Sequence, residues 1–146
     1  GELESKLTAI SARRDTAHAE IKRIESRSAE LALVMKHAGT YRQLKPLYER
    51  YHKSNDKEKF LRGHESEIIL FEATTRELKR LGAVPLPTTE SMKTELANLS
   101  AEKERLLAEY KTARTESQEY ETVKQNVDAL LAVPKEQEQQ RRHELE

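Results

Sequence analysis

The sequence predicts an all-α protein, built as a long antiparallel coiled-coil helical hairpin with two shorter helices packed at the connecting end. Charged residues make up 36% of the 146 residues and aromatic residues only 5%, so the side chains cannot fill a thick core. Two long segments place apolar residues at alternating steps of four and three, which is the spacing of a coiled-coil seam. We therefore expect one elongated domain over residues 1–133, followed by a polar tail at 134–146 that frays.

The first helix is predicted over residues 2–37. Its seam comprises Leu3, Leu7, Ile10, Arg14, Ala17, Ile21, Ile24, Ser28, Leu31 and Met35. A seam of two positions in seven suits one partner helix and is too narrow to face a thick core. Gly39 follows as the expected C-terminal cap of this helix.

The first of the two shorter helices is predicted over residues 41–53. Thr40 and Gln43 have the spacing of a capping box at its start. Pro46 lies inside the segment and is expected to kink or delay the helix, because proline lacks the backbone N–H that a helix interior uses.

The second shorter helix is predicted over residues 56–81, after a break at 54–56. Asn55 and Glu58 form a second capping pattern at this break. An extended connection that contains glycine and proline then covers residues 82–87.

The last helix is predicted over residues 89–132, with Thr88 as its N-cap and Pro134 as its stop. Its seam comprises Met92, Leu96, Leu99, Lys103, Leu106, Tyr110, Ala113, Ser117, Tyr120, Lys124, Val127 and Leu131. Neither long seam is stable alone in water, so each needs a partner helix.

The two long seams have two ways to find a partner. Pairing within the chain places Ile21 opposite Leu106 and Leu7 opposite Tyr120, whereas a homodimer pairs the same seams between chains, and the pattern does not separate the two. Some seam positions are polar: Arg14, Ser28, Lys103, Ser117 and Lys124. These residues either fix the register or mark places where long side chains reach water.

Composition limits the classes of function. Lysine plus arginine equals aspartate plus glutamate at 26 each, so net charge gives no general bias towards nucleic acid or membrane. Cysteine is absent, which excludes disulfides and thiolate metal sites and fits a cytoplasmic protein. No apolar run approaches the roughly 18 residues of a membrane-spanning helix, so we expect no membrane partner.

The clearest functional signal is a basic stretch over residues 36–62, which contains eight lysines and arginines but only three carboxylates. Its candidate contacts for DNA or an acidic partner are Arg42, Lys45, Arg50, Lys53, Lys57, Lys59 and Arg62. Tyrosines 41, 48 and 51 are interleaved with them. Their spacing favours a small core, and the alternative is that their rings stack on unpaired bases.

The segment from His64 to Phe71 raises the question of a metal site. A zinc-binding helix of the His-Glu-x-x-His type needs a second histidine four residues after the first, and Ile68 stands there. We expect His64 to be a partly buried core histidine with one hydrogen-bond partner. No set of nucleophile, base and orienting residue is visible, so we expect no catalytic residue, no metal, no cofactor and no enzyme activity in this chain.

A larger pattern spans residues 40–132. Its positions are Tyr41-Arg42, then Phe60, His64, Glu65, Ile68, Leu70 and Ala73, then Leu86-Pro87, Glu109-Tyr110 and residues 126–131. This pattern resembles the C-terminal helical region of relaxases, the mobilisation nucleases of conjugative elements from Gram-positive bacteria. The first helix resembles only a generic coiled coil.

The resemblance implies a non-catalytic tail that follows a nuclease domain. Relaxases nick one DNA strand at a transfer origin with a catalytic tyrosine and a histidine-bound metal. The histidine-rich motif has no counterpart here, so none of the tyrosines inherits that role. The implied tasks are DNA contact, dimerisation, or docking to a conjugation accessory protein. The alternative function is a structural coiled-coil spacer or oligomerisation module with no nucleic-acid role.

Overall fold

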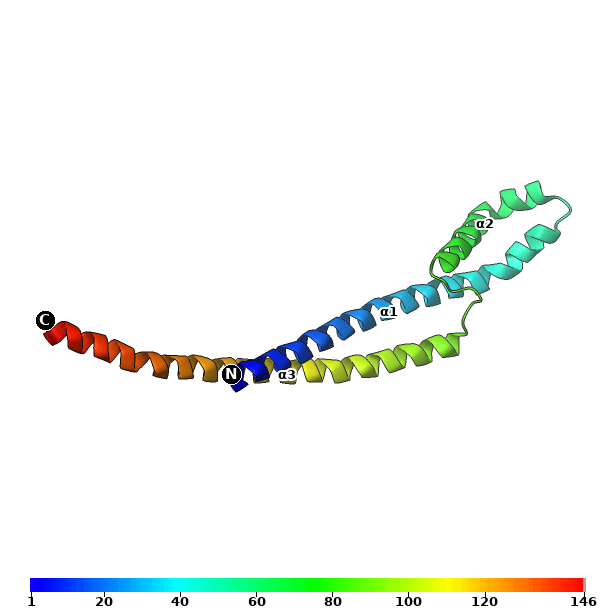
Figure 1. Cartoon of the computed structure of the whole chain (residues 1–146). Coiled ribbons are helices and arrows are strands. Elements are labelled where there is room, and N and C mark those ends of the chain that lie inside the picture. The colour runs from blue at the N-terminus through cyan, green and yellow to red at the C-terminus, as the bar shows by residue number, and fades with distance from the viewer. Residues whose placement is uncertain (146) are drawn as a thin grey trace. The chain divides into compact units, whose positions relative to one another are not determined.

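The computed structural model describes the backbone of residues 1–145 and the side chains of residues 1–132. Within that part the chain forms three helices and no strand: α1 (Glu2–Lys53), α2 (Lys57–Arg80) and α3 (Thr89–Leu145) (Figure 1). The predicted all-α class is therefore confirmed.

The helix α1 is longer than the sequence predicted, because it runs through Gly39 and Pro46 without a break. The expected cap at Gly39 and the capping box at Thr40 are therefore wrong, and one short helix replaces the expected two. The Thr40 hydroxyl donates instead to the carbonyl of Lys36, 3.3 Å away. A Cβ placed on Gly39 would meet no atom within 4 Å, so the glycine fills no steric need.

Packing against α2 explains why α1 continues. A helix-interior glycine costs about 1 kcal/mol relative to alanine, and an interior proline about 3 kcal/mol. The rings of Tyr41 and Tyr48, on either side of Pro46, both stack on Phe71 of α2, with centroid separations of 5.0 and 4.4 Å. These contacts need Tyr41 and Tyr48 on one helical face, so they stabilise the uninterrupted helix.

The break before α2 lies where the sequence predicted it, but its cap is Asp56 rather than Asn55. The Asp56 carboxylate accepts the backbone N–H of Lys59 at 3.1 Å, and the Ser54 hydroxyl accepts the N–H of Asp56 at 3.2 Å. These two bonds satisfy donors that would otherwise be unpaired at the turn and at the start of α2.

The helix α2 ends at a glycine cap, Gly82, whereas the sequence predicted a glycine cap at Gly39. Gly82 has φ of +69°, and the N–H of Ala83 donates to the carbonyl of Leu78 at 2.9 Å. This is the Schellman arrangement, in which the left-handed conformation favours glycine. Thr88 then caps α3 as predicted, since its hydroxyl accepts the N–H of Ser91 at 3.1 Å.

The backbone of α3 continues past Pro134 to Leu145, so the predicted stop at Pro134 is wrong. The predicted fraying of the tail at 134–146 falls on residues whose side chains lie outside the described part.

The chain groups into two compact units, where the sequence suggested one elongated domain. Unit 1 comprises Gly1–Lys22 and Glu102–Glu146, and unit 2 comprises Arg23–Ala101. Each unit therefore contains a part of α1 and a part of α3, and α2 belongs to unit 2.

Unit 1 has a single narrow seam. Its buried residues include Ile10, Ala17 and Ile21 of α1, and Leu106, Ala113 and Ser117 of α3. The Lys6 ammonium lies over the Tyr120 ring, Arg13 pairs with Glu116, and the His18 ring lies near the Tyr110 ring. Along these three contacts, residue numbers on α3 fall as those on α1 rise.

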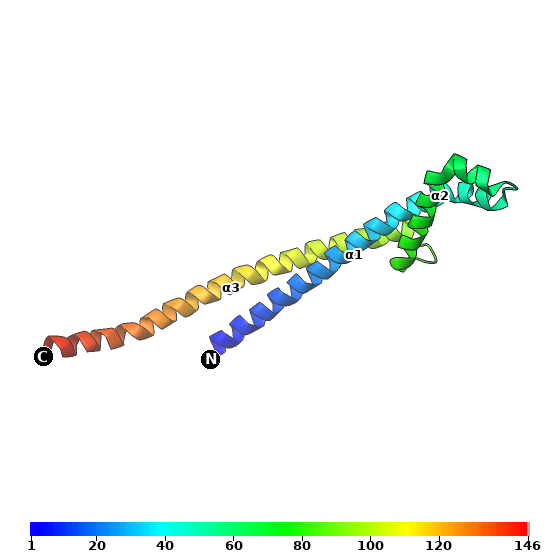
Figure 2. The same cartoon turned by 90° about the horizontal axis from the view of Figure 1, so that it is seen from above.

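Unit 2 has a deeper core because α1 is covered on two sides. Ile24 and Leu31 are buried with Met92 and Leu99 of α3 in this unit. In two views α2 lies alongside the end of α1 (Figures 1 and 2). It contributes four buried residues at helical spacing: Ile68, Phe71, Thr74 and Leu78.

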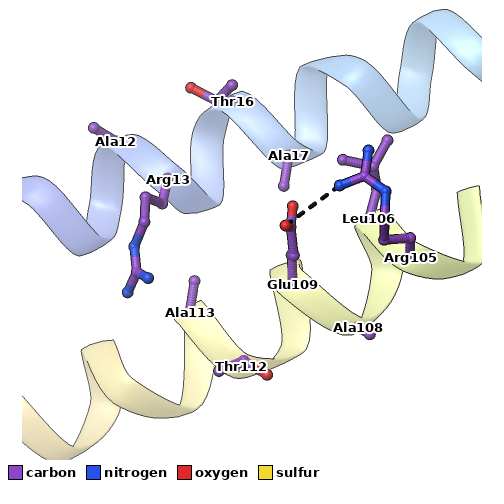
Figure 3. Close-up of a pocket in the computed structure, with 10 residues that line it drawn as sticks. All are labelled: Ala12, Arg13, Thr16, Ala17, Arg105, Leu106, Ala108, Glu109, Thr112 and Ala113. Atoms are coloured by element: carbon purple, nitrogen blue, oxygen red, sulfur yellow. Dashed lines mark hydrogen bonds and ion pairs between the residues drawn. The ribbon is translucent and has the colours of Figure 1, made fainter. Parts of the chain in front are cut away.

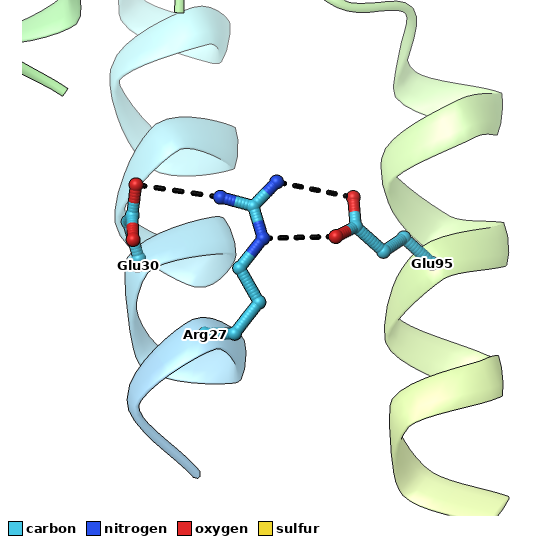
Figure 4. Close-up of polar contacts among 3 residues, drawn as sticks. All are labelled: Arg27, Glu30 and Glu95. Carbon is cyan, nitrogen blue, oxygen red and sulfur yellow. Dashed lines mark hydrogen bonds and ion pairs between the residues drawn. The ribbon is translucent and has the colours of Figure 1, made fainter. Parts of the chain in front are cut away.

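An ion triad links α1 and α3 within unit 2 (Figure 4). The Arg27 guanidinium donates to both carboxylate oxygens of Glu95, at 2.8 and 3.2 Å, and lies 3.3 Å from Glu30. The hydrogen bond to Glu95 raises the pKa of Arg27 above its ordinary value, against a smaller lowering by burial. The triad is well formed in geometry but partly exposed, so its main effect is to fix which residues face one another.

Among the polar seam positions, Ser117 is buried, whereas Arg14, Ser28, Lys103 and Lys124 are half-buried. Half-burial fits long side chains that follow the seam and extend their charges to water.

Candidate nucleic-acid interface

Five of the seven predicted contact residues gather at the turn between α1 and α2. Arg50 and Lys53 occupy the last turn of α1, and Lys57, Lys59 and Arg62 occupy the first two turns of α2. All five side chains are exposed. We call this set the basic end. Two carboxylates, Asp56 and Glu58, lie in the same stretch, and the Asp56 carboxylate is already used as the cap of α2.

The other two predicted residues have different surroundings. The Arg42 guanidinium donates to the Thr89 hydroxyl and to the carbonyl of Pro87, both at 2.9 Å. It therefore ties the start of α3 to α1 and has a structural use that the sequence did not reveal. The Lys45 ammonium lies 5.8 Å from the centre of the Tyr41 ring, in cation–π contact.

An aromatic cluster lies behind the basic end. Tyr41 and Tyr48 stack on Phe71, and the ring of Tyr51 lies 6.0 Å from that of Phe60. The three tyrosines are half-buried, and Phe71 is buried. Their rings therefore pack between α1 and α2, which agrees with the small core that their spacing favoured.

The aromatic cluster also holds one of the cations. The Arg50 guanidinium lies 5.7 Å from the centre of the Phe60 ring. Because Arg50 belongs to α1 and Phe60 to α2, this cation–π contact joins the two helices at the basic end.

Burial raises the pKa of the Tyr48 hydroxyl above its ordinary value, and the negative charge of Glu72, whose carboxylate accepts the hydroxyl at 3.4 Å, adds to the effect. Both causes keep Tyr48 protonated, so it acts as a neutral hydrogen-bond donor in the cluster.

His64 lies at a kink in α2, where its φ of −136° and ψ of 25° depart from helical values. Its ring lies 4.7 Å from that of Phe60, and its Nδ1 atom is 3.7 Å from the Glu67 carboxylate. The ring is half-buried as expected, whereas its Nδ1 atom is buried and makes no hydrogen bond. Among the described residues, no three histidine or carboxylate side chains lie close enough together to hold a metal ion.

A groove of about 710 Å³ opens between the two helices of unit 1 (Figure 3). Small side chains leave this space, among them Ala12 and Ala17 of α1 and Ala108 and Ala113 of α3. The charged residues that line it are exposed: Arg13, Arg105 and Glu109. The groove therefore reflects missing side-chain volume rather than a set of converging chemical groups.

Comparison with known proteins gives this chain no relatives: no protein-family model, curated protein or solved structure matches it. Within the described part of the chain, none of the helices is both long enough and apolar enough to cross a membrane.

Proposed function

We propose that this chain is a non-catalytic helical domain that contacts DNA through its basic end. The supporting observation is the gathering of five exposed cations from two helix ends at one turn. Phosphate contact needs positive charge on one surface and no catalytic group, and this arrangement meets that requirement. The chain has no net charge, so the rest of it does not attract DNA in general. Any attraction to DNA is therefore expected at the local excess of positive charge on the basic end.

We further propose that the domain serves a relaxase in conjugative DNA transfer, in the cytoplasm. The support is the sequence pattern over residues 40–132, in which Phe60, His64 and Ile68 recur every four residues along α2. In this proposal the nuclease chemistry belongs to another domain of the parent protein, and a conjugation accessory protein is a further partner.

The scaffold that presents the basic end completes the proposal. We propose that α1 and α3 pair as an antiparallel coiled-coil hairpin within each unit. In unit 2, Arg27 contacts Glu95 and Arg42 contacts Thr89, so the order of contacts is reversed along the two helices, as it is in unit 1. The alternating steps of four and three at the buried positions support the same pairing.

A titration with a 20-base-pair DNA duplex tests the proposal, with fluorescence anisotropy as the readout at 50 and 200 mM salt. Up to five phosphate contacts give a slope of about −4.5 in a plot of log affinity against log salt. The triple variant Lys53→Gln, Lys57→Gln and Lys59→Gln should bind at least about tenfold more weakly. The matched control neutralises three exposed lysines elsewhere: Lys22→Gln, Lys93→Gln and Lys111→Gln. The proposal is rejected if the affinity does not change with salt concentration, or if both triple variants lose the same amount of affinity for DNA.

A second candidate function is self-association as a spacer or oligomerisation module. The observation that favours it is the apolar surface of α3 at Val127, Leu130 and Leu131, whose exposed fractions are 42%, 72% and 69%. This function predicts no DNA binding and a molecular mass in analytical ultracentrifugation that rises with protein concentration. A mass that stays at one chain over a hundredfold range of concentration excludes it.

A further inference from the structure

Proteins that bind single-stranded nucleic acid present aromatic faces on which successive bases stack. The aromatic rings near the basic end are engaged with one another instead. Tyr41 and Tyr48 stack on Phe71, and the rings of Tyr48 and Tyr51 both lie within 6.0 Å of other rings. Base stacking would require these rings to leave the contact that joins α1 to α2.

The ring of Phe60 is occupied in the same way. The Arg50 guanidinium lies 5.7 Å from its centre, and the His64 ring lies 4.7 Å from it. The aromatic residues therefore position a cation for an anionic ligand and leave little open ring surface for a base.

The surface around the basic end carries charge without an apolar centre. Among residues 42–62, no large apolar side chain is exposed, whereas Ile69 and Leu70 further along α2 are. Specific protein–protein interfaces bury an apolar core inside a polar rim, and the basic end lacks such a core. A polyanion therefore fits this surface better than a folded protein does.

Duplex and single-stranded DNA differ in charge density. A duplex carries one negative charge per about 1.7 Å of its axis, and each strand by itself one per about 3.4 Å. A surface that attracts phosphate and does not stack bases gains more from the denser array of charges.

Building on the proposed function, we propose that the basic end binds duplex DNA through its phosphate backbone alone, and that unpaired bases add nothing to the affinity. The cations of the two helix ends contact phosphates, while the aromatic cluster keeps the turn rigid and holds Arg50 in place. Binding is then independent of base sequence and favours the duplex over a single strand.

Three probes of equal length test this inference with the full chain: a duplex, one of its strands, and the same strand made entirely of abasic nucleotides. The duplex should bind at least about fivefold more tightly than either strand, because its charges are denser. The normal and abasic strands should agree within threefold. A normal strand that binds more than threefold more tightly than the abasic strand, or as tightly as the duplex, overturns the inference.

The variant Tyr51→Leu gives a second readout. It should lower thermal stability, measured by circular dichroism, and change the affinity for all three probes by the same factor, because the aromatic cluster positions Arg50 and contacts no base. Loss of affinity for the normal strand alone, in a folded variant, would show that Tyr51 stacks on bases and would overturn the inference. If none of the probes binds, the proposed function fails as well. Base-dependent binding overturns only this inference and leaves DNA contact intact.

Discussion

Units 1 and 2 are built from parts of the same two long helices, yet their cores differ in depth. The largest side chains that are fully buried in the described part are Ile24, Ile68 and Met92, and all three belong to unit 2. The seam of unit 1 instead includes Ala17 and Ala113, with an open groove beside them.

The difference shows what a third helix contributes. A seam between two helices buries one stripe on each, and its neighbours remain in water. In unit 2, α1 also buries Val34 and Ala38, and further along α1 Tyr41 and Tyr48 stack on Phe71 of α2. The same kind of helix is therefore expected to be more stable where it has two neighbours.

The largest expected effect is at Phe71, where the two tyrosines of α1 stack. The variant Phe71→Ala should lower the free energy of unfolding by about 3–5 kcal/mol, because it removes a buried ring and leaves a cavity. Denaturant titration followed by circular dichroism measures this loss. The control Ile69→Ala, at a position that is 54% exposed, should change stability by less than about 0.5 kcal/mol. Similar losses at both positions would mean that α2 does not pack as described.

A smaller effect is expected in the shallow core of unit 1. Leu106 is buried there, so Leu106→Ala should lower the free energy of unfolding by about 2–3 kcal/mol, near the low end for a core leucine. The control Leu131→Ala, at a position that is 69% exposed, should have almost no effect in the same titration. A large loss in the Leu131 variant would show that this surface is covered in solution, and would favour self-association.

The smallest expected effect is a pH dependence of stability that arises from Tyr48 in the aromatic cluster of unit 2. The pKa of Tyr48 is raised by burial first and by Glu72 second, so the folded chain holds this proton more tightly than the unfolded chain. The resulting stability is complete below the ordinary value of about 10 and is lost as pH rises through the higher folded value. Thermal unfolding at pH 9 to 11 should therefore show a steeper loss for the original chain than for Tyr48→Phe. Parallel curves would contradict the burial of Tyr48.

Burial follows the predicted steps of four and three over most of both seams, but the last part of the predicted α3 seam is wrong, since Val127 and Leu131 are 42% and 69% exposed. Ile10, Ile24, Met92 and Leu106 are all buried at predicted positions. The bounds of α1 were not predictable from local signals, because Gly39 and Pro46 favour an end that the stacking of Tyr48 on Phe71 overrides. Such long-range contacts carry no signature in the neighbouring residues.

The candidate site likewise combines features that the sequence predicts with features that depend on long-range contacts. Exposure of Lys53, Lys57 and Lys59 follows from their place near two helix ends, which the break at 54–56 signals in the sequence. The role of Arg42 depends on Pro87 and Thr89, which lie 45 and 47 residues away along the chain, so it appears only in the folded protein. The kink at His64 likewise has no clear marker except the preceding glycine.

The open surroundings of Gly39 have a practical consequence. The chain contains no cysteine, and a Cβ at Gly39 meets no neighbouring atom within 4 Å. A Gly39→Cys variant would therefore offer a single thiol for attaching a fluorescent or spin reporter. Such a reporter on α1 would follow the response of the helix to added DNA without replacing any residue of the basic end.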